Sequence, residues 1–131
     1  MPATEYTAHL IADALAGGTS YQGPATVYLA LVTTQPTRTV AGTEVTLGNY
    51  VRKTFAQSGW TNDGAGSLTN TADIEYPVTD EDYDDDVIAM EAYSLASGGN
   101  RLYWIDLATP RTVVTGSTPK FLAGDLDLSV V

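Results

Sequence analysis

The chain has 131 residues, a formal net charge of −10, 44% hydrophobic residues and no cysteine. The lack of cysteine excludes disulfides, thiolate metal sites and cysteine nucleophiles. The acidic balance argues against binding to nucleic acid or to anionic membranes, because both need positive charge. The same acidity suits either a generic acidic protein or a protein of a high-salt environment, where screening weakens the repulsion between carboxylates.

The first eighteen residues predict the only helix. Thr4 is a suitable N-cap, and Gly17 and Gly18 end the segment. Apolar residues recur at spacings of three and four and form one stripe: Ala8, Ile11, Ala14 and Leu15. A helix this short is marginal alone, so we expect the stripe to pack either on the protein's own sheet or on a neighbouring molecule.

Short β-strands are predicted throughout residues 19–131. Runs rich in β-branched and aromatic residues, separated by Gly, Pro, Asn and Asp, place them at 26–33, 50–56, 68–76, 87–95, 101–107, 112–114, 121–122 and 126–130. Residues 97–100 suit a hairpin loop, and one long loop separates Thr34 from Gly48. Strand 26–33 is apolar at nearly every position, which is typical of a strand covered on both faces, and the helix is a candidate cover.

The predicted fold is mainly β. We expect an antiparallel β-sandwich or squashed barrel of about seven or eight strands with one N-terminal α-helix. The length favours a single domain over 1–131, with the helix in 1–18 and the sandwich in 19–131. No apolar run approaches the ~20 residues that cross a bilayer, and the segment Met1–Tyr6 lacks the pattern of a signal peptide. We therefore expect no membrane association and no export.

Catalytic signatures are missing from the sequence. His9 is the only histidine, it lies in the predicted helix, and no nucleophile motif accompanies it. Isolated acids on predicted strands (Glu75, Glu91 and Asp106) could form a glycosidase pair only across a cleft, which a sandwich of this size has little room to build. We therefore expect no enzyme activity, no catalytic residue and no cofactor.

Residues 80–86 hold six carboxylates in seven positions. Clustered oxygens attract hard cations such as calcium, but an EF-hand reading fails because Val87 stands where glycine is needed and Tyr93 where glutamate is needed. We therefore predict a solvated acidic loop and no specific metal site. The candidates for weak cation binding are Asp80, Asp82, Asp84 and Asp86.

Aromatic residues are the remaining candidates for a binding surface. On strands such residues are more often core or cross-strand packing, although they could also line a carbohydrate platform or a protein interface. The set comprises Tyr50, Trp60, Tyr76, Tyr83, Tyr93, Tyr103 and Trp104.

Several of these segments, in this order, resemble a family of small virion proteins of tailed viruses that are often labelled tail-fibre, minor-tail or head-decoration proteins. The resemblance rests on residues 23–34, Glu44 with 48–52, Asn70-Thr71 with Ile74, 98–100 and 124–126. It spans nearly the whole chain. The chain departs from the family pattern at Gly116-Ser117 and in the acidic run 80–86.

The resemblance implies a non-enzymatic structural virion protein, made in the host cytoplasm. Such a protein assembles in multiple copies with itself and with other virion proteins on the tail, the baseplate or the capsid surface. Together with the acid excess, it suggests a haloarchaeal virus. The alternative is an adhesion module that binds a host-surface receptor or a carbohydrate through exposed aromatics.

Overall fold

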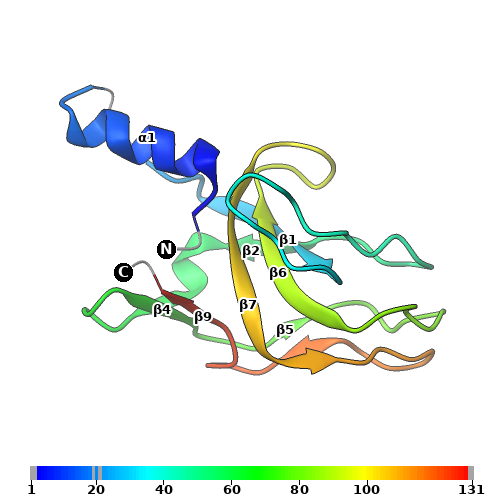
Figure 1. Cartoon of the computed structure of the whole chain (residues 1–131). Helices are drawn as coiled ribbons and strands as arrows, with labels where there is room; N and C mark the ends of the chain where they lie inside the picture. The colour runs from blue at the N-terminus through cyan, green and yellow to red at the C-terminus, as the bar shows by residue number, and fades with distance from the viewer. Residues whose placement is uncertain (1–2, 19, 21, 130–131) are drawn as a thin grey trace.

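The computed structural model describes residues 3–18, 20 and 22–129 (Figure 1). Helix α1 (Glu5–Leu15) comes first, and a short 3-10 helix, η1 (Gln57–Gly59), lies between the second and third strands. The strands are β1 (Thr26–Val32), β2 (Lys53–Ala56), β3 (Trp60–Asn62), β4 (Ser67–Asn70), β5 (Ile74–Glu75), β6 (Val87–Tyr93), β7 (Arg101–Arg111), β8 (Lys120–Phe121) and β9 (Asp127–Ser129).

Within the described residues, nine strands form three antiparallel sheets. The largest has the order β2-β1-β6-β7, a second has the order β3-β4-β9, and β5 pairs with β8. The prediction of a mainly β, antiparallel fold with one N-terminal helix is confirmed. No sheet within the described residues closes into a barrel, so the squashed-barrel alternative is wrong.

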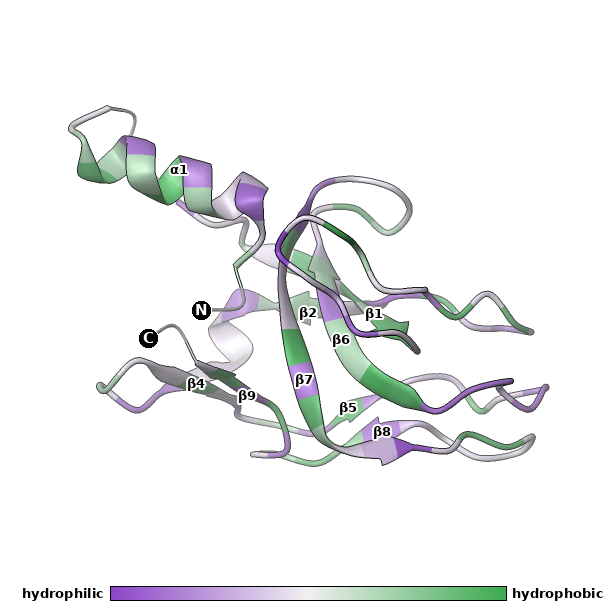
Figure 2. Ribbon diagram, viewed as in Figure 1, coloured by the Kyte–Doolittle hydropathy of each residue, from purple (hydrophilic) through white to green (hydrophobic). Residues whose placement is uncertain are grey.

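The core lies between the four-stranded sheet and the two smaller sheets (Figure 2). One face of β1 supplies Val27, Leu29 and Leu31, each without exposed surface. Phe121 of β8 and Leu128 of β9 belong to the same cluster. Burying a side chain of this size contributes roughly 1.5–3 kcal/mol, so this cluster holds the three sheets together.

The second face of β1 is covered by the long loop, and this corrects the prediction that the helix covers it. Ala30 and Val32 point to this second face and have no exposed surface. Residues 33–48, here named the covering loop, run back over the sheet in cyan in Figure 1. Gly42 lies so close that an added Cβ would stand 2.9 Å from the Val32 Cβ and 2.6 Å from the Thr34 carbonyl oxygen.

Helix α1 projects from the strands (Figure 1). Its N-cap is Thr4, as predicted, and the Thr4 side chain accepts a hydrogen bond from the Thr7 amide. Thr7 is the only buried residue of the helix, whereas Leu15 of the predicted stripe is 83% exposed. The sheet therefore leaves much of the stripe uncovered. No helix among the described residues is long and apolar enough to span a bilayer.

Several strand boundaries differ from the prediction. The predicted strand 68–76 is two strands, β4 and β5, separated at 71–73, and β3 was not predicted. The predicted strand at 112–114 does not form; the Val113 carbonyl instead accepts from the Tyr83 amide. Residues 1 and 2 of the predicted helix and Val130 of the predicted last strand lie outside the described residues.

Candidate functional site

A buried carboxylate on β6 anchors the covering loop to the sheet. Glu91 has no exposed surface, and its carboxylate accepts from Arg101 Nη1 at 3.1 Å, from the Gly42 amide at 3.1 Å and from the Tyr93 hydroxyl at 3.1 Å. Arg101 also donates to the Thr37 carbonyl at 2.6 Å. Because the charge is both paired and hydrogen-bonded, its burial is tolerated, and it fixes the middle of the loop.

A second ion pair fixes the end of the covering loop. Arg52 donates to Glu44 through Nε at 3.0 Å and Nη2 at 2.9 Å, a bidentate arrangement. The Tyr50 hydroxyl donates to the same carboxylate at 2.8 Å and accepts from the Leu31 amide of β1 at 2.9 Å. Burial and the charge of Glu44 raise the pKa of Tyr50 above its ordinary range.

The two ion pairs meet at Tyr93. The Arg52 guanidinium lies 3.8 Å from the centre of the Tyr93 ring, and the Tyr93 hydroxyl bonds to Glu91. Burial and then the charge of Glu91 raise the pKa of Tyr93 to about 12. We name these six residues the arginine–glutamate network: Glu44, Tyr50, Arg52, Glu91, Tyr93 and Arg101.

The arginine–glutamate network holds two loops in place, the covering loop and the loop of the β6–β7 hairpin. Arg52 Nη1 also donates to the Leu95 and Gly98 carbonyls at 2.9 Å, which ties the β6–β7 hairpin to the covering loop. The acids considered for a glycosidase pair are engaged elsewhere: Glu91 with Arg101, Asp106 with Gln35 at 2.8 Å and Glu75 with Lys120 at 3.2 Å. The sequence did not predict this network, although Glu44 and 48–52 carry part of the family resemblance.

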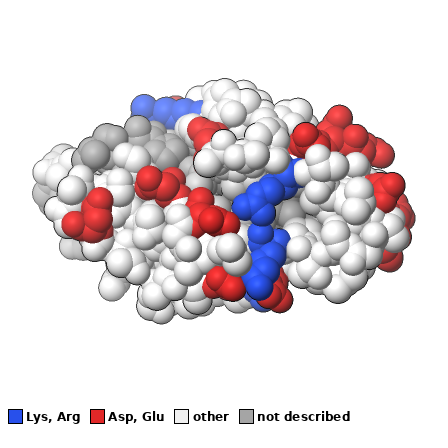
Figure 3. Space-filling view, turned by 90° about the horizontal axis from the view of Figure 1, so that it is seen from below, with Lys and Arg blue, Asp and Glu red and all other residues white. Residues whose placement is uncertain are grey.

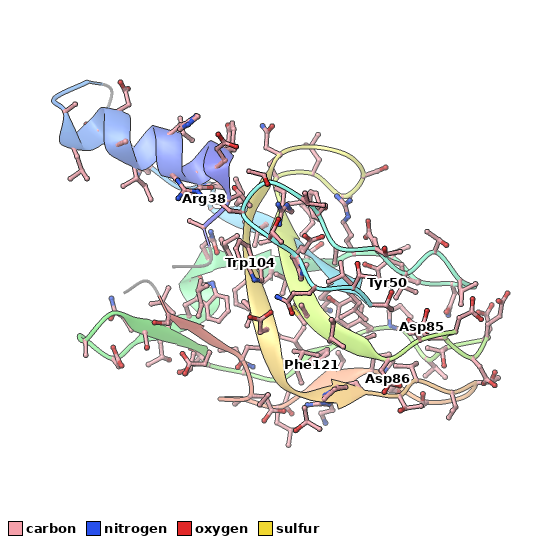
Figure 4. All side chains as sticks on the ribbon, in the orientation of Figure 1. Arg38, Tyr50, Asp85, Asp86, Trp104 and Phe121 are labelled. Atoms are coloured by element: carbon pink, nitrogen blue, oxygen red, sulfur yellow. The ribbon has the colours of Figure 1, made fainter. Side chains whose placement is uncertain are left out.

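The acidic loop places its carboxylates on separate partners. Asp80 accepts from the Asn49 amide, and Asp82 accepts from the Thr115 amide at 2.6 Å, which lowers the pKa of Asp82. Asp86 accepts from the Thr112 hydroxyl at 2.8 Å, while Asp84 is exposed. Figure 4 shows Asp85 and Asp86 at the end of the molecule opposite α1.

No three acids or histidines in the described ranges gather in a way that could hold a metal ion. Weak cation binding by this loop stays a prediction. His9 lies on the exposed side of α1, where its Nε2 is 3.8 Å from Glu5.

The seven aromatic residues of the predicted platform are buried or half-buried, and most contact each other or the network. Tyr76 is 2% exposed, stacks on Tyr50 with ring centres 6.2 Å apart and donates to the Leu29 carbonyl. Trp60 Nε1 donates to the Gln57 side chain at 3.2 Å and to the Tyr103 hydroxyl at 3.3 Å. These contacts assign the rings chiefly to packing inside the fold.

Asn70 joins two segments of the family resemblance that are far apart in sequence. The side chain is 2% exposed. Its amide nitrogen donates to the Ala72 and Leu122 carbonyls at 2.9 Å, and its oxygen accepts from the Gly124 and Leu126 amides at 3.1 and 3.0 Å. Three of the four bonds, to Leu122, Gly124 and Leu126, therefore hold β4 against the segment that leads into β9, and the fourth fixes the turn after β4.

Most of the basic side chains form ion pairs with acidic side chains of the same chain. Arg52 and Arg101 serve the network, Arg111 pairs with Asp125, and Lys120 pairs with Asp73 and Glu75. Figure 3 shows basic side chains in a line across one face, flanked by acidic ones. In the part of the chain that the structure describes, the two remaining cations, Arg38 and Lys53, are exposed and have no ion-pair partner.

Lys53 stands beside an apolar groove between β2 and residues 71–74, here named the β2 groove. Its volume is about 380 Å³. Phe55 and Ile74, which are 9% and 4% exposed, belong to its lining, together with the exposed residues Ala56 and Ala72. The β2 groove adjoins an edge strand of the large sheet.

Comparison with known proteins gives one result at the level of families. A family model described as "Podophage GP4 fiber I protein gp80" matches residues 2–129. No curated protein matches the chain. The match covers helix α1, all nine strands, the covering loop and the β2 groove.

Proposed function

Because the chain belongs to the family described as Podophage GP4 fiber I protein gp80, we propose that it is a non-enzymatic component of the tail of a virus particle and works there in multiple copies. The family is one of phage fibre proteins, so the chain is a structural protein of a tailed virus. The observation that carries the proposal is the extent of the match, since residues 2–129 take in the whole described fold.

The firmly held loops and the covered edge of the large sheet support a structural role. The arginine–glutamate network and the four bonds of Asn70 fix segments that lack regular secondary structure. One edge of the large sheet, at β7, is partly covered, because the Thr4 amide donates to the Leu102 carbonyl and Ala3 bridges to Tyr103. Covered or short edges limit uncontrolled strand pairing among many copies.

Labelling of purified particles tests this proposal. Antibodies raised against the chain, coupled to gold, should decorate the tail, and mass spectrometry should find the chain in particles purified through a density gradient. Antibody absorbed with the purified chain is the control. Decoration of the capsid alone would overturn the tail position, and particles that lack the chain would overturn the structural role.

A further inference from the structure

The tip of helix α1 is an apolar knob with a negative end. Leu15 is 83% exposed, the highest value among the large apolar side chains in the described part of the chain. A helix C-terminus carries partial negative charge. The last turn contains Asp13 and no basic residue to offset that charge. Figure 1 shows this tip pointing away from the strands.

The β2 groove has the complementary features. Phe55 and Ile74 give it an apolar lining. The lining also includes Asp73, whose carboxylate pairs with Lys120 at 3.5 Å, whereas Lys53 on the same strand as Phe55 is a cation without a partner. Basic side chains interact favourably with the last carbonyls of a helix. The only other unpaired cation of the described residues, Arg38, belongs to the covering loop, and its carbonyl accepts from the Glu5 amide at the opposite end of α1.

We propose that the tip of α1 of one copy inserts Leu15 into the β2 groove of a second copy, with Lys53 of the second copy against the C-terminus of the helix. This inference rests on the proposed function, which requires several copies in one particle. A second copy is the occupant because a chain of net charge −10 repels itself except where a free cation meets a negative end. One sequence supplies both halves of the contact.

The contact is head-to-tail. Each copy offers its helix tip to one neighbour and its groove to another, so the contact closes into a ring or continues as a filament. The area of one short helix is small, which makes the contact weak in solution and effective only where copies are held close together.

Disulfide trapping tests the contact on the full chain, because the chain has no cysteine of its own. Leu15→Cys and Ser58→Cys, the second in the groove lining, are mixed and oxidised with oxidised glutathione. We expect a mixed disulfide dimer in about tenfold higher yield than from Leu15→Cys mixed with Ser97→Cys, a control on the β6–β7 hairpin. A yield equal to that control would overturn the proposal.

Two additional cross-linking experiments test whether the dimer reports the proposed contact. Ala72→Cys replaces Ser58→Cys at a second groove position and should give the same dimer, which guards against a single variant that misfolds. A strong dimer of Leu15→Cys with itself would instead indicate helix–helix pairing and overturn the proposal. Circular dichroism checks the fold of each variant.

Charge reversal tests the role of Lys53. Lys53→Glu in the Ser58→Cys chain should lower the cross-linking yield several-fold, because the new carboxylate faces the negative helix end. Arg38→Glu makes the same change of net charge at the other unpaired cation and should leave the yield unchanged. An equal loss in both variants would overturn the assigned role of Lys53.

Particle labelling separates this inference from the proposed function. If the antibody decorates tails and no cross-link forms, the proposed function stands and the head-to-tail contact is wrong. If particles lack the chain, the proposed function fails whatever the cross-linking shows.

Discussion

The covering loop and helix α1 are both additions to the large sheet, and they are held in opposite ways. The covering loop has almost no regular secondary structure, yet Pro36 within it is fully buried. The Gly42 amide of the loop also donates a hydrogen bond to the Glu91 carboxylate of β6. The helix has regular structure, but only Thr7 is buried. Regularity within an element therefore does not determine how firmly it is attached; contacts with the sheet do.

Charge explains much of this difference. Two arginines connect the covering loop to β6 and β7, through a bidentate pair with Glu44 and a buried pair with Glu91. The charged-type contact within the helix is that of His9 Nε2 with the Glu5 carboxylate, 3.8 Å apart, between exposed side chains of the same helix. Pairs of that kind contribute little. The two ion pairs therefore fix the covering loop to the sheet, whereas most of the surface of helix α1 stays exposed.

The largest predicted effect is the loss of the buried charge under the loop. Glu91→Gln leaves the guanidinium of Arg101, which is 10% exposed, without its counter-charge. Breaking a buried pair by removing one partner costs about 3–5 kcal/mol. We expect the free energy of unfolding, measured by urea titration, to fall by about 3 kcal/mol or more.

Glu75→Gln is the matched control for that experiment. The same substitution removes a partner of Lys120 from a pair whose side chains are 54% and 42% exposed, and exposed pairs contribute about 0–1 kcal/mol. Equal losses in the two variants would contradict the distinction between loop and surface ion pairs.

The close approach of the covering loop to β1 gives the next effect. Gly42→Ala places a Cβ against the Thr34 carbonyl oxygen and the Val32 side chain. Overpacking of this kind costs about 1–3 kcal/mol, and we expect a loss in that range by urea titration. Ala41→Ser, at the exposed neighbouring position, should change the stability by less than about 0.5 kcal/mol. A stable Gly42→Ala variant would show that the loop moves freely.

The base of the helix gives a smaller effect. Thr4 caps the Thr7 amide, and its hydroxyl lies 2.6 Å from the Arg101 carbonyl. Thr4→Ala should cost about 1–2 kcal/mol and lower the helical circular dichroism signal at ordinary temperature. Thr4→Ser keeps the hydroxyl and should retain both. An unchanged helical signal in Thr4→Ala would mean that the helix is held elsewhere along its length.

The smallest predicted effect is a dependence on alkaline pH within the network. The pKa of Tyr93 is raised from 10.0 to about 12, so the folded protein retains the proton better than the unfolded chain does. The resulting stabilisation is present below pH 10 and is lost as the pH rises toward 12. Tyr93→Phe should cost about 1 kcal/mol at pH 8.

The same variant should also lose less stability between pH 10 and 12 than the parent chain. Urea titrations at several pH values measure both effects. An alkaline decline identical to that of the parent chain would assign the pH dependence to other tyrosines, of which Tyr50 and Tyr76 also have raised pKa values.

Local sequence signals predicted much of the fold. Thr4 and Gly17 marked the ends of the helix, and the apolar run at 26–32 marked β1, because capping and strand patterns act over a few residues. The cover of β1 could not be predicted, since a loop packs through contacts such as that of Gly42 with Glu91, 49 positions apart. Val113 was assigned to a strand by its apolarity alone, although its burial serves the core.

The candidate site was harder to predict than the fold. The acidic run 80–86 stood out by its composition, yet its carboxylates bond to separate backbone and hydroxyl groups. The β2 groove left no sequence signal, because Phe55 and Ile74 meet only after β2 and β5 are placed. The family resemblance located Asn70 and 124–126 as separate pieces, and only the structure shows the amide bonds between them.

The bonds of Asn70 also affect how the protein is made. β9 pairs with β4, which is translated more than fifty residues earlier, and the Leu126 amide completes the set of bonds on Asn70. A nascent chain on the ribosome therefore holds Leu68 and its neighbours uncovered until residues 126–129 have left the exit tunnel. A premature stop codon shortly before Leu126 would release an incomplete chain with this apolar surface exposed, and host chaperones and proteases would bind or degrade it before it reached a growing particle.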